Sequence, residues 1–165
     1  MSTASPPMQP QQPPSIPQDI GVNVNVERVE PSVKPMEISL PLPRVPHTTL
    51  HIHLTFLATS TMVFLATTTP GDGAGTLKPM GSFVYAMPDR TNPRSTISTV
   101  LYSTPMTVDY ATRTAKILAR RMGVPVYVGC SIDTMATGTT AEEEMEGVAK
   151  IVEVIMQKWD EREKK

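Results

Sequence analysis

Prolines are concentrated at one end of this chain, and this restricts which part of it can fold. Eleven of the 17 prolines lie within the first 46 of 165 residues, and residues 1–20 consist largely of Pro, Gln and Ser. Such a segment cannot bury enough apolar surface to offset the conformational entropy that it would lose on folding. We therefore expect a disordered Pro-rich tail over residues 1–35 and one folded domain over residues 36–162.

Charge, cysteine content and hydropathy exclude several classes of protein. The formal net charge is −1, which is unlike the strongly basic balance of most nucleic-acid-binding domains. A single cysteine excludes a disulfide framework and a zinc module built on several cysteines. No apolar run approaches the roughly 18 residues of a membrane span, and we see no signal peptide. We expect a soluble cytoplasmic protein, with the nucleus left open, that binds neither nucleic acid nor membrane.

Alternating apolar and polar residues predict strands in the first part of the expected domain. The pattern is clearest from Leu50 to Phe56, and a short polar turn then leads into an apolar run, which predicts a hairpin. A third strand places Phe83 and Tyr85 on one face. The strands are expected over residues 50–56, 62–69, 81–87 and 97–102.

Two further alternating segments lie nearer the N-terminus. Residues 38–42 alternate, but Pro41 and Pro43 cannot donate a backbone hydrogen bond to a neighbouring strand. This segment must therefore be an edge strand or an extended arm. Valines alternate with polar residues over residues 22–26, which predicts a weak strand or a disordered arm.

The hydrophobic period changes to that of a helix between Thr107 and Met122. Thr107 is the expected N-cap, and Gly123 lies where a glycine often ends a helix. The apolar stripe of this helix, which we expect to face the core, consists of Val108, Ala111, Ala115, Leu118 and Met122.

A short strand over residues 126–128 separates this helix from a second one. Thr140 and Glu143 have the spacing of a capping box, and the helix is expected to run to about Glu161. Its apolar stripe consists of Met145, Val148, Val152, Ile155 and Trp159. Consecutive strands with short connections favour the α+β class, with an antiparallel sheet of about six strands covered by two main helices.

Two groups of residues could carry chemistry, and neither forms a complete site in the sequence. His51 and His53 share one face of a strand, a spacing that can bind a metal, but His47 is the only other histidine and no acidic residue lies nearby. Cys130 lacks any local sign of a base. We interpret these residues as structural and expect no enzyme activity, metal or cofactor. An enzyme that uses His51 and His53, or Cys130, is kept as an alternative.

The expected middle helix carries a cluster of basic residues on one side. Residues 48–140 contain seven Lys or Arg against four Asp or Glu, which makes this part of the chain positive. The cluster consists of Arg113, Lys116, Arg120 and Arg121. We predict that these four residues bind an acidic protein surface, with a merely solvated helix face as the alternative.

The order of these segments resembles the proteasome assembly chaperone 4 family. The segment LHIHLTFLATSTMVFLATTT is similar to the His-x-His strand and the following apolar strand of that family, and GSFVYAMPDR to its next strand. The segments ISTVLYS and YATRTAKILARRMGVPVYVGCSI resemble its next strand, helix and returning strand. The likeness extends from Thr49 to Trp159. The Pro-rich head and the glycine loop at 70–81 depart from shorter members and suggest a fungal-type form.

The resemblance implies a non-enzymatic role in building the 20S proteasome. Members pair with proteasome assembly chaperone 3 as a heterodimer, and the pair holds α-type subunits together while the α-ring forms. Such templating raises the effective concentration of neighbouring subunits for one another. A generic adaptor whose Pro-rich head docks into a groove is the remaining alternative. The interface residues of the family form no linear motif that can be transferred to this sequence.

We predict that deleting residues 1–20 leaves the melting temperature of the folded domain unchanged. The segment has no apolar periodicity with which to pack on a domain. Differential scanning calorimetry of the full and shortened chains measures this directly, and a loss of several degrees would show that the head packs on the domain.

Overall fold

The computed structural model describes residues 33–45, 47–73, 78–92, 94–132 and 140–164. These residues form six strands and two helices, all within the structural unit that spans residues 31–165. The elements are β1 (Met36–Pro41), β2 (Thr49–Phe56), β3 (Thr61–Thr68), β4 (Ser82–Pro88), β5 (Thr96–Tyr102), α1 (Val108–Met122), β6 (Val126–Cys130) and α2 (Ala141–Glu163). The expected strand or arm at 22–26 and nearly all of the predicted tail lie outside the described residues, so both stay predictions.

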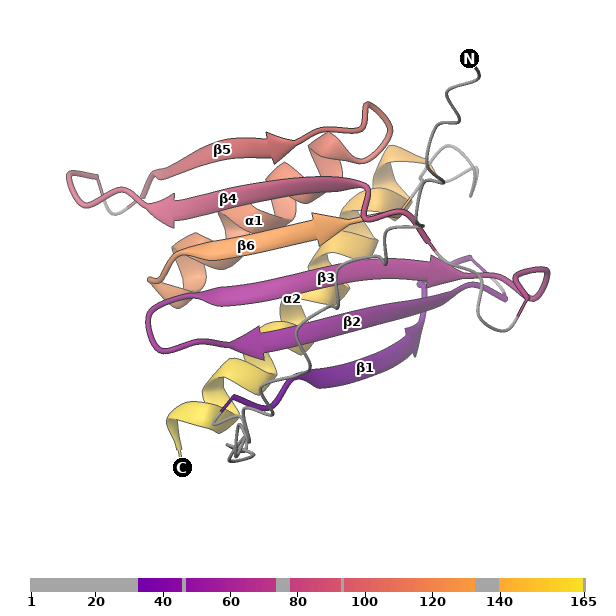
Figure 1. The fold of residues 1–165 in the computed structure, drawn as a ribbon, viewed down its shortest axis with the longest axis horizontal. Helices are drawn as coiled ribbons and strands as arrows, with labels where there is room; N and C mark the ends of the chain where they lie inside the picture. The colour runs from indigo at the N-terminus through magenta and orange to yellow at the C-terminus, as the bar shows by residue number, and fades with distance from the viewer. Residues whose placement is uncertain (1–32, 46, 74–77, 93, 133–139, 165) are drawn as a thin grey trace, which may run out of the picture. The chain divides into compact units, whose positions relative to one another are not determined.

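The strands form one sheet in the order β1-β2-β3-β6-β4-β5 (Figure 1). The α+β class, the six strands and the two helices are confirmed. Four of the five described pairings are antiparallel, whereas β3 and β6 run parallel. Short connections indicated antiparallel neighbours, but the chain crosses through α1 before it forms β6. That crossover lets β6 enter the sheet between β3 and β4 rather than at an edge. β1 is an edge strand, as its prolines predicted.

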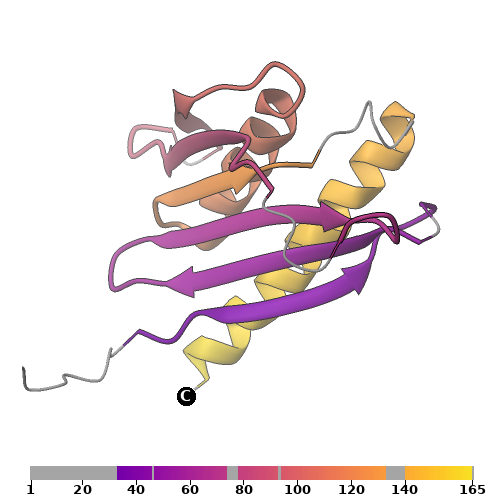
Figure 2. The same ribbon diagram turned by 45° about the vertical axis from the view of Figure 1, so that its right-hand side comes forward.

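Both helices lie on one face of the sheet (Figures 1 and 2). The core between the sheet and the two helices is apolar. Each fully buried aliphatic side chain contributes about 1.5–3 kcal/mol to the free energy of unfolding. Phe56 and Trp159 close one end of this core with an edge-to-face contact at 5.4 Å between ring centroids. The largest fully buried core side chains from the sheet are Leu50, Ile52, Leu54, Val63, Leu65, Val84, Val126 and Val128, and those from the helices include Leu118, Ile151 and Ile155. Within the described ranges, no helix is long and apolar enough to cross a membrane.

The ends of the helices largely follow the predicted capping signals. Thr140 and Glu143 form the expected capping box, in which the backbone N–H of Thr140 donates to the Glu143 carboxylate at 2.8 Å. This bond is the largest cause that lowers the pKa of the Glu143 carboxyl. The contribution of the box to stability is therefore present at neutral pH and is lost as the pH falls through the folded-state pKa. Gly123 ends α1 in the left-handed conformation, as predicted.

Thr107 occupies the N-cap position of α1, but its side chain makes no capping hydrogen bond. Its Oγ1 instead accepts a hydrogen bond from the backbone N–H of Ser82 at 2.9 Å and lies 2.7 Å from the Ser82 Oγ. Ser82 and Thr107 are both buried, so these bonds satisfy polar atoms that would otherwise be costly. The Thr107 hydroxyl therefore ties the start of α1 to the start of β4.

The predicted apolar stripes need two corrections. Val108 is only half-buried, and Met145 is 63% exposed. The helical period tells which residues share a face, but it does not tell where the neighbouring elements end. Tyr110 and Ala119, which the stripe left out, are buried in the core of α1.

Gly81 marks a place where two backbones approach closely. Its φ is +68°, and a Cβ at this position would lie 1.9 Å from the carbonyl oxygen of Cys130 at the end of β6. Only a residue without a side chain fits here, because both the dihedral angle and the neighbouring backbone exclude a Cβ.

We predict that Gly81→Ala lowers the free energy of unfolding by about 3 kcal/mol, the sum of a left-handed conformation and overpacking. Gly71→Ala is the matched control, because a Cβ at that position meets nothing within 4 Å. The control is expected to change stability by less than about 0.5 kcal/mol. Urea unfolding of both variants tests this, and equal stabilities would contradict it.

Candidate protein-binding surfaces

The sheet face opposite the helices carries a set of half-buried apolar and aromatic side chains. They occupy the positions of the strands that alternate with the core residues, so they point away from α1 and α2. No helix of the described part of the chain covers them (Figure 1). We call this surface the open face, and its central members are His51, His53, Met62, Phe64, Phe83, Tyr85, Met87 and Tyr127.

Five rings of the open face lie next to one another and form an aromatic row. His53 stacks on Phe64 with 6.3 Å between ring centroids, and Phe64 lies almost parallel to Phe83 at 6.0 Å. Phe83 in turn stacks on Tyr127 at 6.1 Å, and Tyr127 contacts Tyr85 at 4.8 Å. Each aromatic pair stabilises its arrangement by about 0.5–1.5 kcal/mol beyond the area that it buries. The row is therefore an ordered surface.

A glycine makes this row possible. Gly129 of β6 is the register partner of Phe64 on one side and of Phe83 on the other. A Cβ at position 129 would lie 2.5 Å from the Phe64 ring. The missing side chain thus lets the two phenyl rings meet across the strand that separates them.

The outermost strand, β5, exposes four apolar side chains. They are between 44% and 57% exposed, namely Ile97, Val100, Leu101 and Tyr102. Ile97 is the register partner of Met87 and extends the open face, whereas Val100 is the partner of the buried Val84 and lies on the helix side. Tyr102 is the register partner of Phe83, which joins this strand to the aromatic row. β5 contains neither a charged residue nor a proline, whereas β1 at the other edge has Glu37 and Pro41. An uncharged apolar edge is the kind of strand that pairs with another chain.

Sequence reasoning missed the open face, although a signal was present. The run from Met62 to Leu65 is apolar at consecutive positions, which is typical of a strand covered on both faces. We interpreted the run only as the second strand of a hairpin. Phe83 and Tyr85 were predicted correctly to share a face, but that face was not recognised as uncovered.

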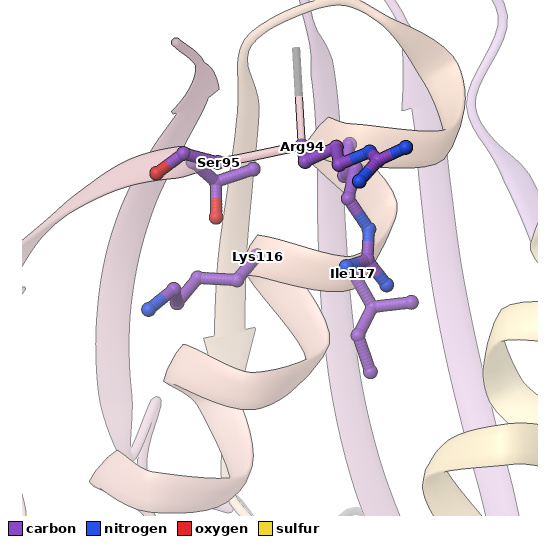
Figure 3. A pocket seen from close by; sticks show the side chains of 6 residues that line it. Arg94, Ser95, Lys116 and Ile117 are labelled. Atoms are coloured by element: carbon purple, nitrogen blue, oxygen red, sulfur yellow. The ribbon is translucent and has the colours of Figure 1, made fainter. Parts of the chain in front are cut away.

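The four predicted basic residues are all exposed on α1, and the structure separates them into two pairs. Lys116 and Arg120, together with Arg94, line a hollow of about 260 Å³ between α1 and the segment before β5 (Figure 3). Arg113 and Arg121 line a second hollow of about 250 Å³ between α1 and α2. None of these five cations forms an ion pair with a carboxylate of the described residues.

The two histidines do not form a metal site with other described residues. His51 Nδ1 lies 2.9 Å from the Ser39 hydroxyl, and its Nε2 lies 2.8 Å from the Thr68 hydroxyl. His53 stacks on Phe64. No group of three His, Cys, Asp or Glu side chains able to hold a metal ion occurs in the described ranges. Both ring nitrogens of His51 thus have hydroxyl partners within the sheet.

Cys130 lies at the end of β6 and is fully buried. Burial raises the pKa of its thiol to about 12, so the thiol stays protonated at neutral pH. Because the thiolate is the reactive species, this environment does not suit a nucleophile. The interpretation of Cys130 as a small buried residue at a strand end is confirmed.

The sequence profile of the family described as Proteasome assembly chaperone 4 matches residues 49–132, which is half of the chain. The chain belongs to this family. The matched segment begins with β2 and ends just after β6, so it contains the whole aromatic row. The family resemblance found in the sequence is confirmed, and with it a chaperone role in proteasome assembly. No curated protein matches the chain.

A solved structure shares the fold. A chain of a novel chaperone complex for yeast 20S proteasome assembly superposes with a TM-score of 0.54 at 17% sequence identity. The alignment covers 78% of the present chain and 95% of the yeast chain. At this identity the likeness shows the fold alone, and it agrees with the family.

We predict that Cys130 of the native chain reacts negligibly with a disulfide reagent such as DTNB at pH 8. Both the raised pKa and the burial of the thiol oppose reaction. Because the chain has one cysteine, the absorbance change reports this residue only. Full reaction is expected after unfolding in urea, and rapid labelling of the native chain would support the enzyme alternative.

Proposed function

We propose that this chain pairs with proteasome assembly chaperone 3 through its open face, and that the pair holds α-type subunits while the α-ring of the 20S proteasome forms. The observation that carries the proposal is the aromatic row on a sheet face that no helix of the described residues covers. The role is one of binding and release rather than catalysis. The cytoplasm, with the nucleus left open, stays the predicted location.

The composition of the open face supports pairing with another folded chain. Aromatic residues and methionine are enriched at the centres of protein interfaces, and Tyr and Phe lose little conformational entropy when they are covered. The rings are already held in place by one another, as their centroid distances of 4.8–6.3 Å indicate. A preorganised surface of this kind binds with a smaller entropic cost than a flexible one.

The arrangement of the two surfaces supports a templating role. The aromatic row and the exposed cations of α1 lie on opposite sides of the sheet, because α1 packs on the face opposite the open face (Figure 2). One side is thus available for the partner chaperone while the other contacts a proteasome subunit. Simultaneous binding of neighbouring subunits raises their effective concentration, which promotes ring formation.

The alternative of a generic adaptor rests on the Pro-rich head rather than on the folded domain. Residues 1–32 lie outside the described part of the chain, so that alternative stays a prediction. The family match and the aromatic row both lie within residues 49–132. The domain, and not the head, is therefore proposed to carry the function.

We predict that the chain alone self-associates, and that co-expression with proteasome assembly chaperone 3 yields a one-to-one complex in native mass spectrometry. Phe83→Ser and Gly129→Ala are expected to weaken this complex at least about tenfold, the effect of losing one central aromatic contact. In the second variant the added methyl group displaces the Phe64 ring.

The matched control for both variants is Lys116→Glu/Arg120→Glu, which changes exposed residues on the other side of the sheet. It is expected to leave the affinity for the partner chaperone unchanged. The proposal fails if the chain is a stable monomer that ignores this partner. It also fails if the two open-face variants bind the partner as tightly as the unchanged chain does.

A further inference from the structure

The groove between α1 and α2 combines exposed cations with an apolar lining. Arg113 and Arg121 from α1 border it, and Met145, Val148 and Val152 from α2 form an apolar floor. Ile117, which lies between the two arginines in the sequence of α1, and Ala149 of α2 complete the lining. We call this hollow of about 250 Å³ the α1–α2 groove.

The arginines of the groove form no ion pair with the acidic residues of α2 in the described ranges. Glu146 pairs with Arg44 at 2.8 Å, and Glu153 pairs with Lys150 at 2.9 Å. No carboxylate of the described residues forms an ion pair with Arg113 or Arg121. Both guanidinium groups are therefore available to carboxylates of another molecule, and such pairs are often bidentate.

The apolar floor is partly uncovered. Val148 and Val152 are buried, but Met145 on the same stripe of α2 is 63% exposed. A methionine side chain is flexible and polarizable, so it adapts to an apolar partner of irregular shape. A ligand that pairs with the arginines and also covers Met145 gains both electrostatic and apolar contacts.

The combination selects a polypeptide rather than a polyanion. A nucleic acid or an anionic lipid surface offers phosphates. These would bind all the cations of α1 without distinction and would leave the apolar floor uncovered. The net charge of −1 also opposes general binding of polyanions. An acidic protein segment with an apolar side chain satisfies both parts of the groove.

The spacing of the arginines sets the pattern of that segment. Eight positions along a helix correspond to about 12 Å, which an extended chain spans in about four residues. Alternate side chains of an extended chain point to the same side. Carboxylates at positions i and i+4 with an apolar residue at i+2 therefore present all three groups to the groove.

We propose that the α1–α2 groove binds an extended acidic segment of an α-type proteasome subunit, with carboxylates on Arg113 and Arg121 and an apolar side chain on Met145. The identity of the partner rests on the proposed function, whereas the chemistry of the segment rests on the groove alone. Lys116 and Arg120 contribute to the positive field of α1 without touching the segment.

A peptide tests the chemistry of the groove without relying on a proteasome subunit. The probe is Ser-Glu-Ser-Leu-Ser-Glu-Ser, blocked at both ends, titrated into the full chain in complex with proteasome assembly chaperone 3. The methyl resonance of Met145, identified by its absence in Met145→Leu, is expected to shift on binding. Replacing the leucine by serine, or both glutamates by glutamine, is expected to weaken binding at least about fivefold, within the range of single apolar or charge-pair contacts.

Two double charge reversals on α1 distinguish direct binding in the α1–α2 groove from a general electrostatic attraction to the helix. Arg113→Glu/Arg121→Glu is expected to weaken binding of the peptide by about tenfold or more. Lys116→Glu/Arg120→Glu makes the same change in net charge in the other hollow, and is expected to have an effect below about threefold. Equal losses in both variants, or no loss in the first, would overturn the proposal.

Purified α-type subunits of the 20S proteasome, tested one at a time against the same variants, identify the source of the segment. The expected result is that at least one subunit binds and that the two double variants lose affinity for it in the same order as for the peptide.

If the peptide behaves as expected but no subunit binds even the unchanged complex, the proposed function fails and the acidic-segment site remains. If a subunit binds but both double variants bind it as the unchanged complex does, the proposed function stands and the groove assignment is wrong. A homodimer that Arg113→Glu/Arg121→Glu abolishes would assign the groove to a second copy and overturn its assignment to a proteasome subunit.

Discussion

The insertion of β6 between β3 and β4 is the pairing on which the rest of the fold depends. It joins the β1-β2-β3 meander to the β4-β5 hairpin through one parallel and one antiparallel ladder. Val126 and Val128 are fully buried beneath the helices, so the strand is also the centre of the core. Without β6, two half-sheets would each expose an unpaired inner edge.

The same strand connects the core to the open face. Toward the helices it carries a continuous apolar face, and toward the open face it carries Gly129 and Tyr127. The glycine leaves room for two phenyl rings, and the tyrosine links them to Tyr85. A second glycine, Gly81, lets the backbone at the start of β4 pass close to Cys130. The five residues of β6 therefore contribute both to the core and to the arrangement of the aromatic row.

Local signals allowed most of the elements to be predicted from the sequence. The capping box at Thr140, the glycine that ends α1 and the prolines that confine β1 to an edge act over a few residues, so their effect could be inferred directly. The family resemblance was also carried by the order of these local elements.

The features that escaped prediction depend on residues far apart in the chain. The parallel pairing of β3 and β6 follows from a crossover, and the Thr107 hydroxyl turns to Ser82 because folding brings β4 beside the start of α1. The aromatic row needs four strands in register before its rings can meet. The two hollows beside α1 likewise depend on which neighbour flanks each side of the helix.

The strand order also affects how this chain can fold during its synthesis on the ribosome. Residues 61–65 of β3 must wait for residues 126–130 before their second backbone ladder can form. Until then the nascent chain presents unsatisfied β3 and β4 edges, and long-range closure of this kind is slow. A chain with this topology therefore exposes unpaired strand edges until residues 126–130 have been synthesised, and such edges favour aggregation while they are unpaired.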